Sequence, residues 1–112
     1  MAMSGVFMDL GSVSADINSL VTADRALIRR IGIFGSLARG GYNDSSDIDL
    51  LIEYASTPNF ILDRFDRFCG VCNKLVDFLS AKYMRGVDIV QFSGDPSNFL
   101  NDESICDEVI WL

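Results

Sequence analysis

Histidine is absent from this 112-residue sequence. Its absence excludes histidine-dependent catalytic triads, histidine-ligated zinc sites and imidazole acid–base chemistry. Cysteine is scarce, with three residues: Cys69, Cys72 and Cys106. Because this number is odd and the sequence shows no export signal, we expect no disulfide framework. Cys69 and Cys72 match the spacing of a thioredoxin-type motif, but they fall within a long amphipathic pattern. We therefore favour a structural position on a helix over a redox site.

Basic residues and long apolar runs are also scarce. The chain has 9 Lys and Arg against 16 Asp and Glu, a formal net charge of -7. Non-specific binding to a nucleic-acid duplex requires a basic surface, so we expect no direct nucleic-acid partner, whereas a small nucleotide with metal ions remains open. No apolar run approaches the ~20 residues that span a bilayer, and no secretory signal opens the chain. We expect a cytoplasmic protein with no membrane partner.

The apolar patterning predicts a single α/β domain over residues 1–112, and a hydrophobic content of 49% is enough to fill its core. Ser12 or Ser14 can cap the first helix, and Asp24 interrupts its apolar face. The expected fold class is a small α/β (α+β) sandwich with helices covering a sheet of at least three strands. In chain order we expect a frayed start (1–12), a helix (13–28), strands at 31–34 and 47–54, a long helix starting at 57–59, a strand at 87–92 and one or two short helices within 98–112.

Two aspartates alternate with aliphatic residues in Ser46-Asp47-Ile48-Asp49-Leu50-Leu51-Ile52. On a strand this spacing puts both carboxylates on one face, with Cα atoms roughly 6.5–7 Å apart. At 4 Å and an effective dielectric near 20, two such charges repel by about 4 kcal/mol. A divalent cation relieves that repulsion, and hard oxygen ligands suit Mg²⁺ or Mn²⁺. The alternative is a polar strand face without a metal.

A glycine-serine turn precedes this strand in Gly35-Ser36-Leu37-Ala38-Arg39-Gly40. Together the two segments resemble the signature of the minimal nucleotidyltransferases, which belong to the polymerase-beta-like nucleotidyltransferase superfamily. The resemblance covers about residues 31–90, and the apolar end at 109–112 resembles that group too. It implies the nucleotidyltransferase fold, with a small mixed sheet. It also implies metal-dependent transfer of AMP from ATP, with Mg²⁺ or Mn²⁺ as cofactor.

The resemblance also implies the roles of individual residues. Asp88 alternates with apolar neighbours on the last predicted strand, and would join the other two carboxylates if that strand lies beside theirs. It could then help take the proton from the acceptor hydroxyl; the alternative is an edge-strand aspartate without a role. Arg39 could reach a phosphate oxygen or be a solvated loop arginine. The implied site comprises Asp47, Asp49 and Asp88 as catalytic metal ligands, and Gly35, Ser36, Arg39 and Ser46 as nucleotide-binding residues.

Minimal nucleotidyltransferases lack the helical domain with which larger relatives bind the base and the acceptor, so the resemblance implies a protein partner. Such proteins are often antitoxins paired with HEPN-domain toxins, and can transfer AMP to a tyrosine of the toxin. The chain departs from many relatives in having no Lys or Arg between Asp95 and Leu112. Two hypotheses follow: an active protein adenylyltransferase, or a non-catalytic antitoxin that neutralises its partner by direct contact. A homo-oligomer is compatible with either.

Overall fold

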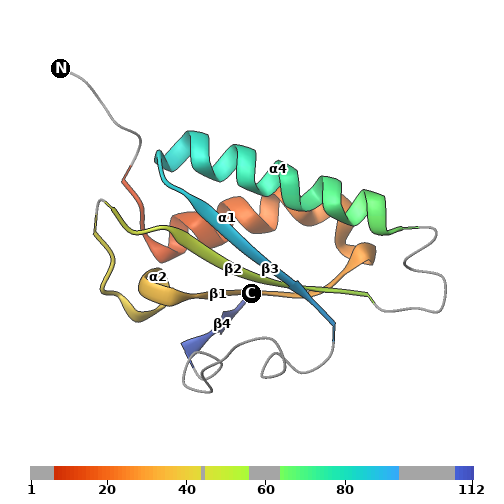
Figure 1. The fold of residues 1–112 in the computed structure, drawn as a ribbon, viewed down its shortest axis with the longest axis horizontal. Helices are drawn as coiled ribbons and strands as arrows, with labels where there is room; N and C mark the ends of the chain where they lie inside the picture. Colours follow the sequence, from red (N-terminus) through yellow and green to blue (C-terminus); the bar gives the residue numbers. More distant parts are fainter. Residues whose placement is uncertain (1–6, 44, 56–63, 94–107) are drawn as a thin grey trace.

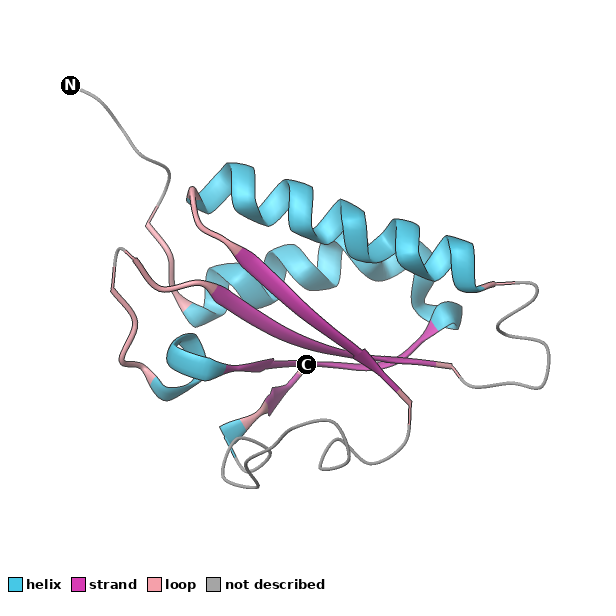
Figure 2. Cartoon of the chain, viewed as in Figure 1, coloured by secondary structure: helices cyan, strands magenta, loops and turns pink. Residues whose placement is uncertain are grey.

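The computed structural model describes residues 7–43, 45–55, 64–93 and 108–112. Two helices and a mixed sheet form the body of the molecule (Figures 1 and 2). In chain order the elements are α1 (Leu10–Val21), the 3₁₀ helix η1 (Thr22–Leu27), β1 (Ile28–Phe34), α2 (Gly35–Arg39), β2 (Ile48–Tyr54), α4 (Phe65–Tyr83), β3 (Val87–Phe92) and β4 (Ile110–Trp111). None of the helices in these residues is long and apolar enough to cross a membrane.

The strands form one sheet in the order β3-β2-β1-β4. Strand β1 runs antiparallel to both β2 and β4, whereas β2 and β3 are parallel. The register places Asp49 opposite Phe34 on one side and opposite Asp88 on the other. Residues in register share a face of the sheet, so these three side chains leave the sheet on the same side.

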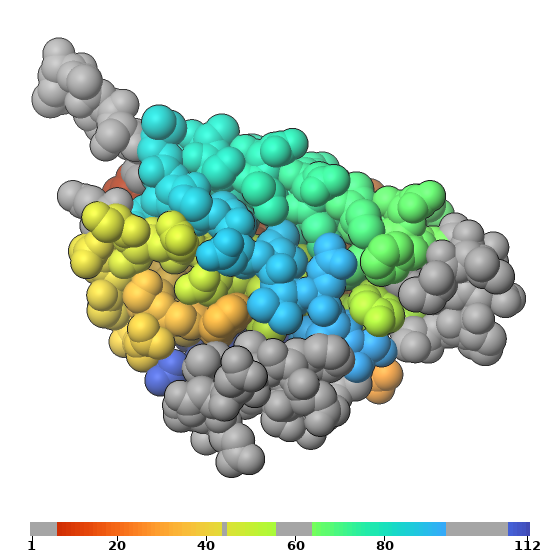
Figure 3. All heavy atoms as spheres, in the orientation of Figure 1, coloured from red at the N-terminus to blue at the C-terminus, as the bar shows by residue number. Residues whose placement is uncertain are grey.

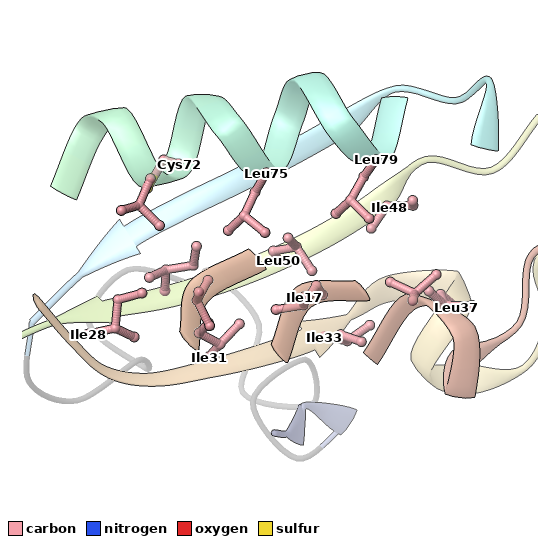
Figure 4. Packing of buried hydrophobic residues seen from close by; sticks show 14 of the residues in the cluster. Ile17, Ile28, Ile31, Ile33, Leu37, Ile48, Leu50, Cys72, Leu75 and Leu79 are labelled. Carbon is pink, nitrogen blue, oxygen red and sulfur yellow. The ribbon is translucent and has the colours of Figure 1, made fainter. Parts of the chain in front are cut away.

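Helices α1 and α4 cover the other face (Figure 1). Ile48 and Leu50 of β2 point toward Ile17 of α1 and toward Leu75 and Leu79 of α4 (Figure 4). All five side chains are fully buried, and burial of such an aliphatic side chain contributes about 1.5–3 kcal/mol. Because side chains alternate along a strand, packing Ile48 and Leu50 against the helices turns the intervening Asp49 outward.

Polar contacts fix the two helices to each other. Asp16 of α1 accepts hydrogen bonds from Lys82 Nζ at 2.8 Å and from the Tyr83 hydroxyl at 2.5 Å, both on α4. Lys74 Nζ, nearer the start of α4, lies 3.4 Å from Asp24 Oδ2 of η1. The contacts of Lys82 and Tyr83 thus hold the end of α4 from which the loop to β3 starts.

The first helix begins and ends earlier than we expected. Asp9, rather than Ser12 or Ser14, is its cap, because the Asp9 carboxylate accepts from Ser12 N at 2.7 Å. Helix α1 thus starts at Leu10, inside the stretch 1–12 for which we expected a frayed start. The expected helix over 13–28 is wrong at its end: the backbone kinks at Asp24, the residue that interrupts the apolar face, and Ile28 already belongs to β1.

The remaining elements mostly follow the sequence pattern. Strand β3 has the expected bounds, and β2 starts one residue later than expected, at Ile48. The tail holds a strand that we did not expect, β4, which pairs with β1. The expected helix start at 57–59 lies outside the described residues, as do most of the expected helical tail and Cys106.

Cys69 and Cys72 both lie on α4, as the amphipathic pattern predicts, and both are free thiols. Burial raises the pKa of the Cys72 thiol to about 11, so that it stays protonated near neutral pH. The nucleophilic form of cysteine is the thiolate, and redox-active cysteines have lowered pKa values. The structural reading of Cys72 therefore fits this geometry better than the redox reading.

Candidate active site

Two segments far apart in the sequence meet on the sheet face opposite α1 and α4. The first runs from α2 through the following loop to the start of β2, and the second is the start of β3. In Figure 3 the orange and yellow atoms of the first segment lie beside the blue atoms of β3. The candidate carboxylates belong to this region: Asp49 and Asp88 occupy adjacent strands in register, and Asp47 directly precedes β2.

Gly35, the first residue of α2, packs directly against Asp49. Its φ of +73° is in the left-handed region, which side chains with a Cβ rarely adopt. A Cβ built on Gly35 would lie 2.2 Å from Asp49 Oδ2. The carboxylate thus occupies the space that glycine leaves free. The resemblance implies that Gly35 binds the nucleotide, and the structure adds a contact with Asp49 that the motif did not indicate.

Asp47 has a matching contact on its own side of the site. A Cβ on Gly86, the last residue before β3, would lie 2.7 Å from Asp47 Oδ1. The Gly86 carbonyl accepts a hydrogen bond from Ile48 N at 2.9 Å. Gly86 is not among the residues predicted for the site. Its closeness to Asp47 depends on the pairing of β2 with β3, which no local pattern reveals.

The carboxylates influence one another electrostatically. Burial raises the pKa of Asp49 above its ordinary value of 3.8, and the charges of Asp88 and Asp47 raise it further. The Arg39 guanidinium has the opposite, smaller effect on that pKa. The negative charge of Asp49 is thus the one that this environment disfavours, and a cation beside it would stabilise the charged form.

The expected nucleotide-binding residues lie around these carboxylates with different contacts. Ser36 is the second residue of α2, and its carbonyl accepts from the backbone N–H groups of Gly40 and Gly41. Arg39, at the end of α2, forms an ion pair with Glu108 over 3.1 Å. Ser46 holds the loop before β2, since its Oγ accepts from Asn43 N at 2.9 Å. Ser46 thus has a structural contact that the motif did not indicate.

The donor chemistry at this site fits Mg²⁺ or Mn²⁺, because carboxylate oxygens are the ligands these ions prefer. In residues 7–43, 45–55, 64–93 and 108–112, however, no three His, Cys, Asp or Glu side chains converge closely enough to hold a metal ion together. Asp47, Asp49 and Asp88 are near enough for their charges to interact. Binding a metal through all three would require their side chains to turn toward a common point.

Comparison with known proteins identifies the family. The family model described as "Polymerase beta, Nucleotidyltransferase" matches residues 17–111. The chain belongs to this family. The match includes α2, all four strands and each of the seven residues of the predicted site.

Similar proteins carry related names. Protein adenylyltransferase MntA of Thermococcus cleftensis is 28% identical over 103 residues, which cover 87% of this chain and 93% of MntA. The candidate protein adenylyltransferase MJ1215 of Methanocaldococcus jannaschii is 44% identical over 55 residues, which cover 47% of this chain and 64% of that relative. A solved structure of a candidate minimal nucleotidyltransferase shares the fold with a TM-score of 0.60 at 26% identity, over 96% of this chain and all of the other.

These findings confirm the resemblance that the motif indicated and the predicted fold class of helices on a mixed sheet. They also agree with the predicted reaction class, because relatives over most of this chain's length are named protein adenylyltransferases. The assignment of single residues to catalysis or nucleotide binding stays a prediction.

Proposed function

We propose that this protein transfers AMP from ATP to a hydroxyl of a protein partner, with Mg²⁺ or Mn²⁺ at the carboxylates. The observation that carries the proposal is the arrangement of Asp49 and Asp88 in register on adjacent strands, with Gly35 against Asp49 and Asp47 one residue outside the sheet. The raised pKa of Asp49 supports a cation site, since nearby positive charge would offset the repulsion that raises it.

The reaction would be an in-line displacement at the α-phosphorus of ATP. The acceptor oxygen forms a bond to that phosphorus, and the bond from phosphorus to the bridging oxygen of the β-phosphate breaks, releasing pyrophosphate. When bound, the divalent cation supplies positive charge at the phosphate oxygens. The chain has no Walker lysine motif, which argues against γ-phosphoryl transfer.

Asp88 is the carboxylate we assign to the acceptor. It lies on β3, an edge strand of the sheet, and its side chain is exposed. A protein hydroxyl can therefore approach it from solvent, and the carboxylate can take the proton that the hydroxyl loses. Asp47 and Asp49 would hold the cation on the nucleotide side.

Arg39 is the cationic side chain we assign to the triphosphate. Its ion pair with Glu108 is half-exposed, and such pairs contribute only about 0–1 kcal/mol. A triphosphate carries more negative charge than one carboxylate, so it can replace Glu108 as the partner of Arg39. The positive charge of the Arg39 guanidinium also lowers the pKa of Asp49, so this side chain already stabilises negative charge at the site.

The acceptor we propose is a tyrosine of a HEPN-type toxin, which makes this protein an antitoxin. The name of the relative MntA supports a protein acceptor, and the sequence resemblance to the minimal nucleotidyltransferases supports the toxin as the class of partner. The acidic net charge of -7 supports a protein rather than a nucleic acid in this role.

A titration with Mn²⁺ tests the cation site. The wild type should release or absorb heat on binding, and Asp47→Asn with Asp49→Asn should abolish the signal, because neutral amides replace both carboxylates. The matched control is Asp66→Asn with Asp77→Asn, which removes the same charge from the exposed side of α4. Equal Mn²⁺ binding by the two double variants would contradict the proposed site.

A further inference from the structure

Asp47 differs from Asp49 in how the fold holds it. Asp49 lies within β2 and pairs with residues on both neighbouring strands. Asp47 precedes the first residue of β2 and is exposed. The sheet hydrogen bonds therefore do not fix its position, although a ligand must be held in place to bind a cation tightly.

The loop before Asp47 is a tight turn with its own hydrogen bonds. Asn43 Oδ1 accepts from Ser45 N at 2.8 Å, and the Asn43 carbonyl accepts from Ser46 N at 3.1 Å. Ser46 Oγ accepts from Asn43 N at 2.9 Å. These bonds close the turn on itself, but they do not attach it to the rest of the protein.

Arg85 attaches this turn to the loop between α4 and β3. Its Nη1 donates to the Ser46 carbonyl at 3.0 Å and also to the Asn43 carbonyl. A hydrogen bond from a charged donor is roughly twice as strong as a neutral one. The Ser46 carbonyl belongs to the peptide that joins Ser46 to Asp47. The Arg85 guanidinium therefore holds the backbone directly before the aspartate.

Gly86 completes the contact on the other side of Asp47. The Gly86 carbonyl accepts a hydrogen bond from the backbone N–H of Ile48, the residue that follows Asp47. Its missing Cβ leaves room for the Asp47 carboxylate, which a Cβ would meet at 2.7 Å. Asp47 thus has one flanking peptide bound by Arg85, the other bound by Gly86, and its side chain packed on Gly86.

We propose that Arg85 and Gly86 form a positioning pair that holds Asp47 beside the proposed cation site. Gly86 stands two residues before Asp88 in the sequence, so the pair also couples the start of β3 to the start of β2. This inference rests on the proposed function in one respect, that Asp47 is a cation ligand. Neither residue touches the reacting atoms.

The test measures Mn²⁺ affinity and amide hydrogen exchange on the full chain without nucleotide or partner. Arg85→Met and Gly86→Ala should each weaken Mn²⁺ binding about 10–100-fold, the usual effect of removing a group that orients a metal ligand. The Ile48 amide should exchange faster in both variants, while amides in α1 stay protected. Arg85→Lys keeps the charge but not the shape of the guanidinium, and should bind Mn²⁺ with intermediate affinity.

Two matched controls separate positioning from general effects. Arg67→Met removes an exposed arginine of α4, and Gly41→Ala adds a methyl group where nothing lies within 4 Å. Both should bind Mn²⁺ as the wild type does. A merely structural role predicts that Arg85→Met lowers the melting temperature and leaves the Mn²⁺ affinity unchanged.

The outcomes distinguish the two proposals. If the wild type binds Mn²⁺ and Arg85→Met binds it equally well, the positioning pair is wrong and the proposed function stands. If the wild type binds no Mn²⁺, the cation site itself is wrong, and the positioning pair falls with it. Weakened binding in Arg85→Met and Gly86→Ala, with both controls unchanged, supports the positioning pair.

Discussion

At the scale of single residues, two glycines set the geometry of the candidate site. Gly35 packs on the carboxylate of Asp49, and Gly86 packs on that of Asp47. In each case the glycine leaves the volume in which a carboxylate oxygen lies. The placement of the two aspartates is therefore determined by backbone positions outside their own strand.

The contact at Gly35 can be separated from its backbone conformation, because Gly40 offers a matched comparison. Both have φ in the left-handed region, at +73° and +84°, but a Cβ on Gly40 meets nothing within 4 Å. Replacing either with alanine should cost about 1–2 kcal/mol of stability. Only Gly35→Ala should also abolish AMP transfer, since its methyl group displaces the Asp49 carboxylate. Denaturant unfolding and a transfer assay measure the two effects, and full activity in Gly35→Ala would refute the role of this contact.

The raised pKa of Asp49 predicts a pH dependence of stability. The pKa of Asp49 in the folded protein exceeds its ordinary value of 3.8. The folded protein therefore loses stability as the pH rises from 3.8 through the raised pKa, because Asp49 ionises less readily in the folded chain than in the unfolded one. Without divalent cations, Asp49→Asn should therefore melt at a higher temperature than the wild type near neutral pH. The difference should shrink as pH falls from neutral and be lost below the ordinary pKa of 3.8, because the carboxyl group then binds its proton in both the folded and the unfolded chain.

Adding Mn²⁺ should reverse that order, because only the wild type gains stability from binding the cation. The exposed Asp77→Asn on α4 controls for the loss of one negative charge from an acidic protein. Thermal unfolding across pH measures the effect. A variant Asp49→Asn that is less stable than the wild type near neutral pH without metal would contradict this electrostatic account.

At the scale of elements, local patterning predicted those strands whose alternation is clear. Strand β3 has the expected bounds at Val87–Phe92, and the alternation of Asp47 and Asp49 with aliphatic residues located β2. The sequence did not reveal β4, because it has only two residues and exists through pairing with β1. The contacts of Gly86 were missed for the same reason, since they depend on which strands lie side by side.

Strand β4 depends on a glycine in the strand it pairs with. A Cβ on Gly32 would lie 2.3 Å from Val109 Cγ1 and 2.9 Å from Trp111 Cε3. Gly32→Ala should therefore push β4 off the sheet edge and cost about 1–3 kcal/mol, as overpacking usually does. Trp111 is the one tryptophan of the chain, so its fluorescence should shift to the red. Gly41→Ala is the control, and an unchanged emission spectrum in Gly32→Ala would disprove the packing.

At the scale of the whole molecule, the main buried core lies between the helices and one face of the sheet, and Asp49 and Asp88 lie on the other face. The residues of the core could be predicted from the periodicity of the apolar side chains, and with them the helices that cover a sheet. The arrangement of the candidate site depends instead on which strands pair, and on the charges of side chains far apart in the sequence. The alternation along β2 predicted that Asp49 faces away from the apolar core, but no local pattern predicted that Glu108 pairs with Arg39.

The most direct test of the account is the fate of labelled phosphate. With Mg²⁺ and the proposed partner, a HEPN-type toxin, label on the α-phosphate of ATP should appear on the toxin, and label on the γ-phosphate should leave with pyrophosphate. Asp49→Ala should abolish labelling and still bind the toxin, since a cation ligand need not contact the partner. Transfer of γ-label would contradict the reaction class, and neutralisation of the toxin without any label would show an antitoxin that acts by contact alone.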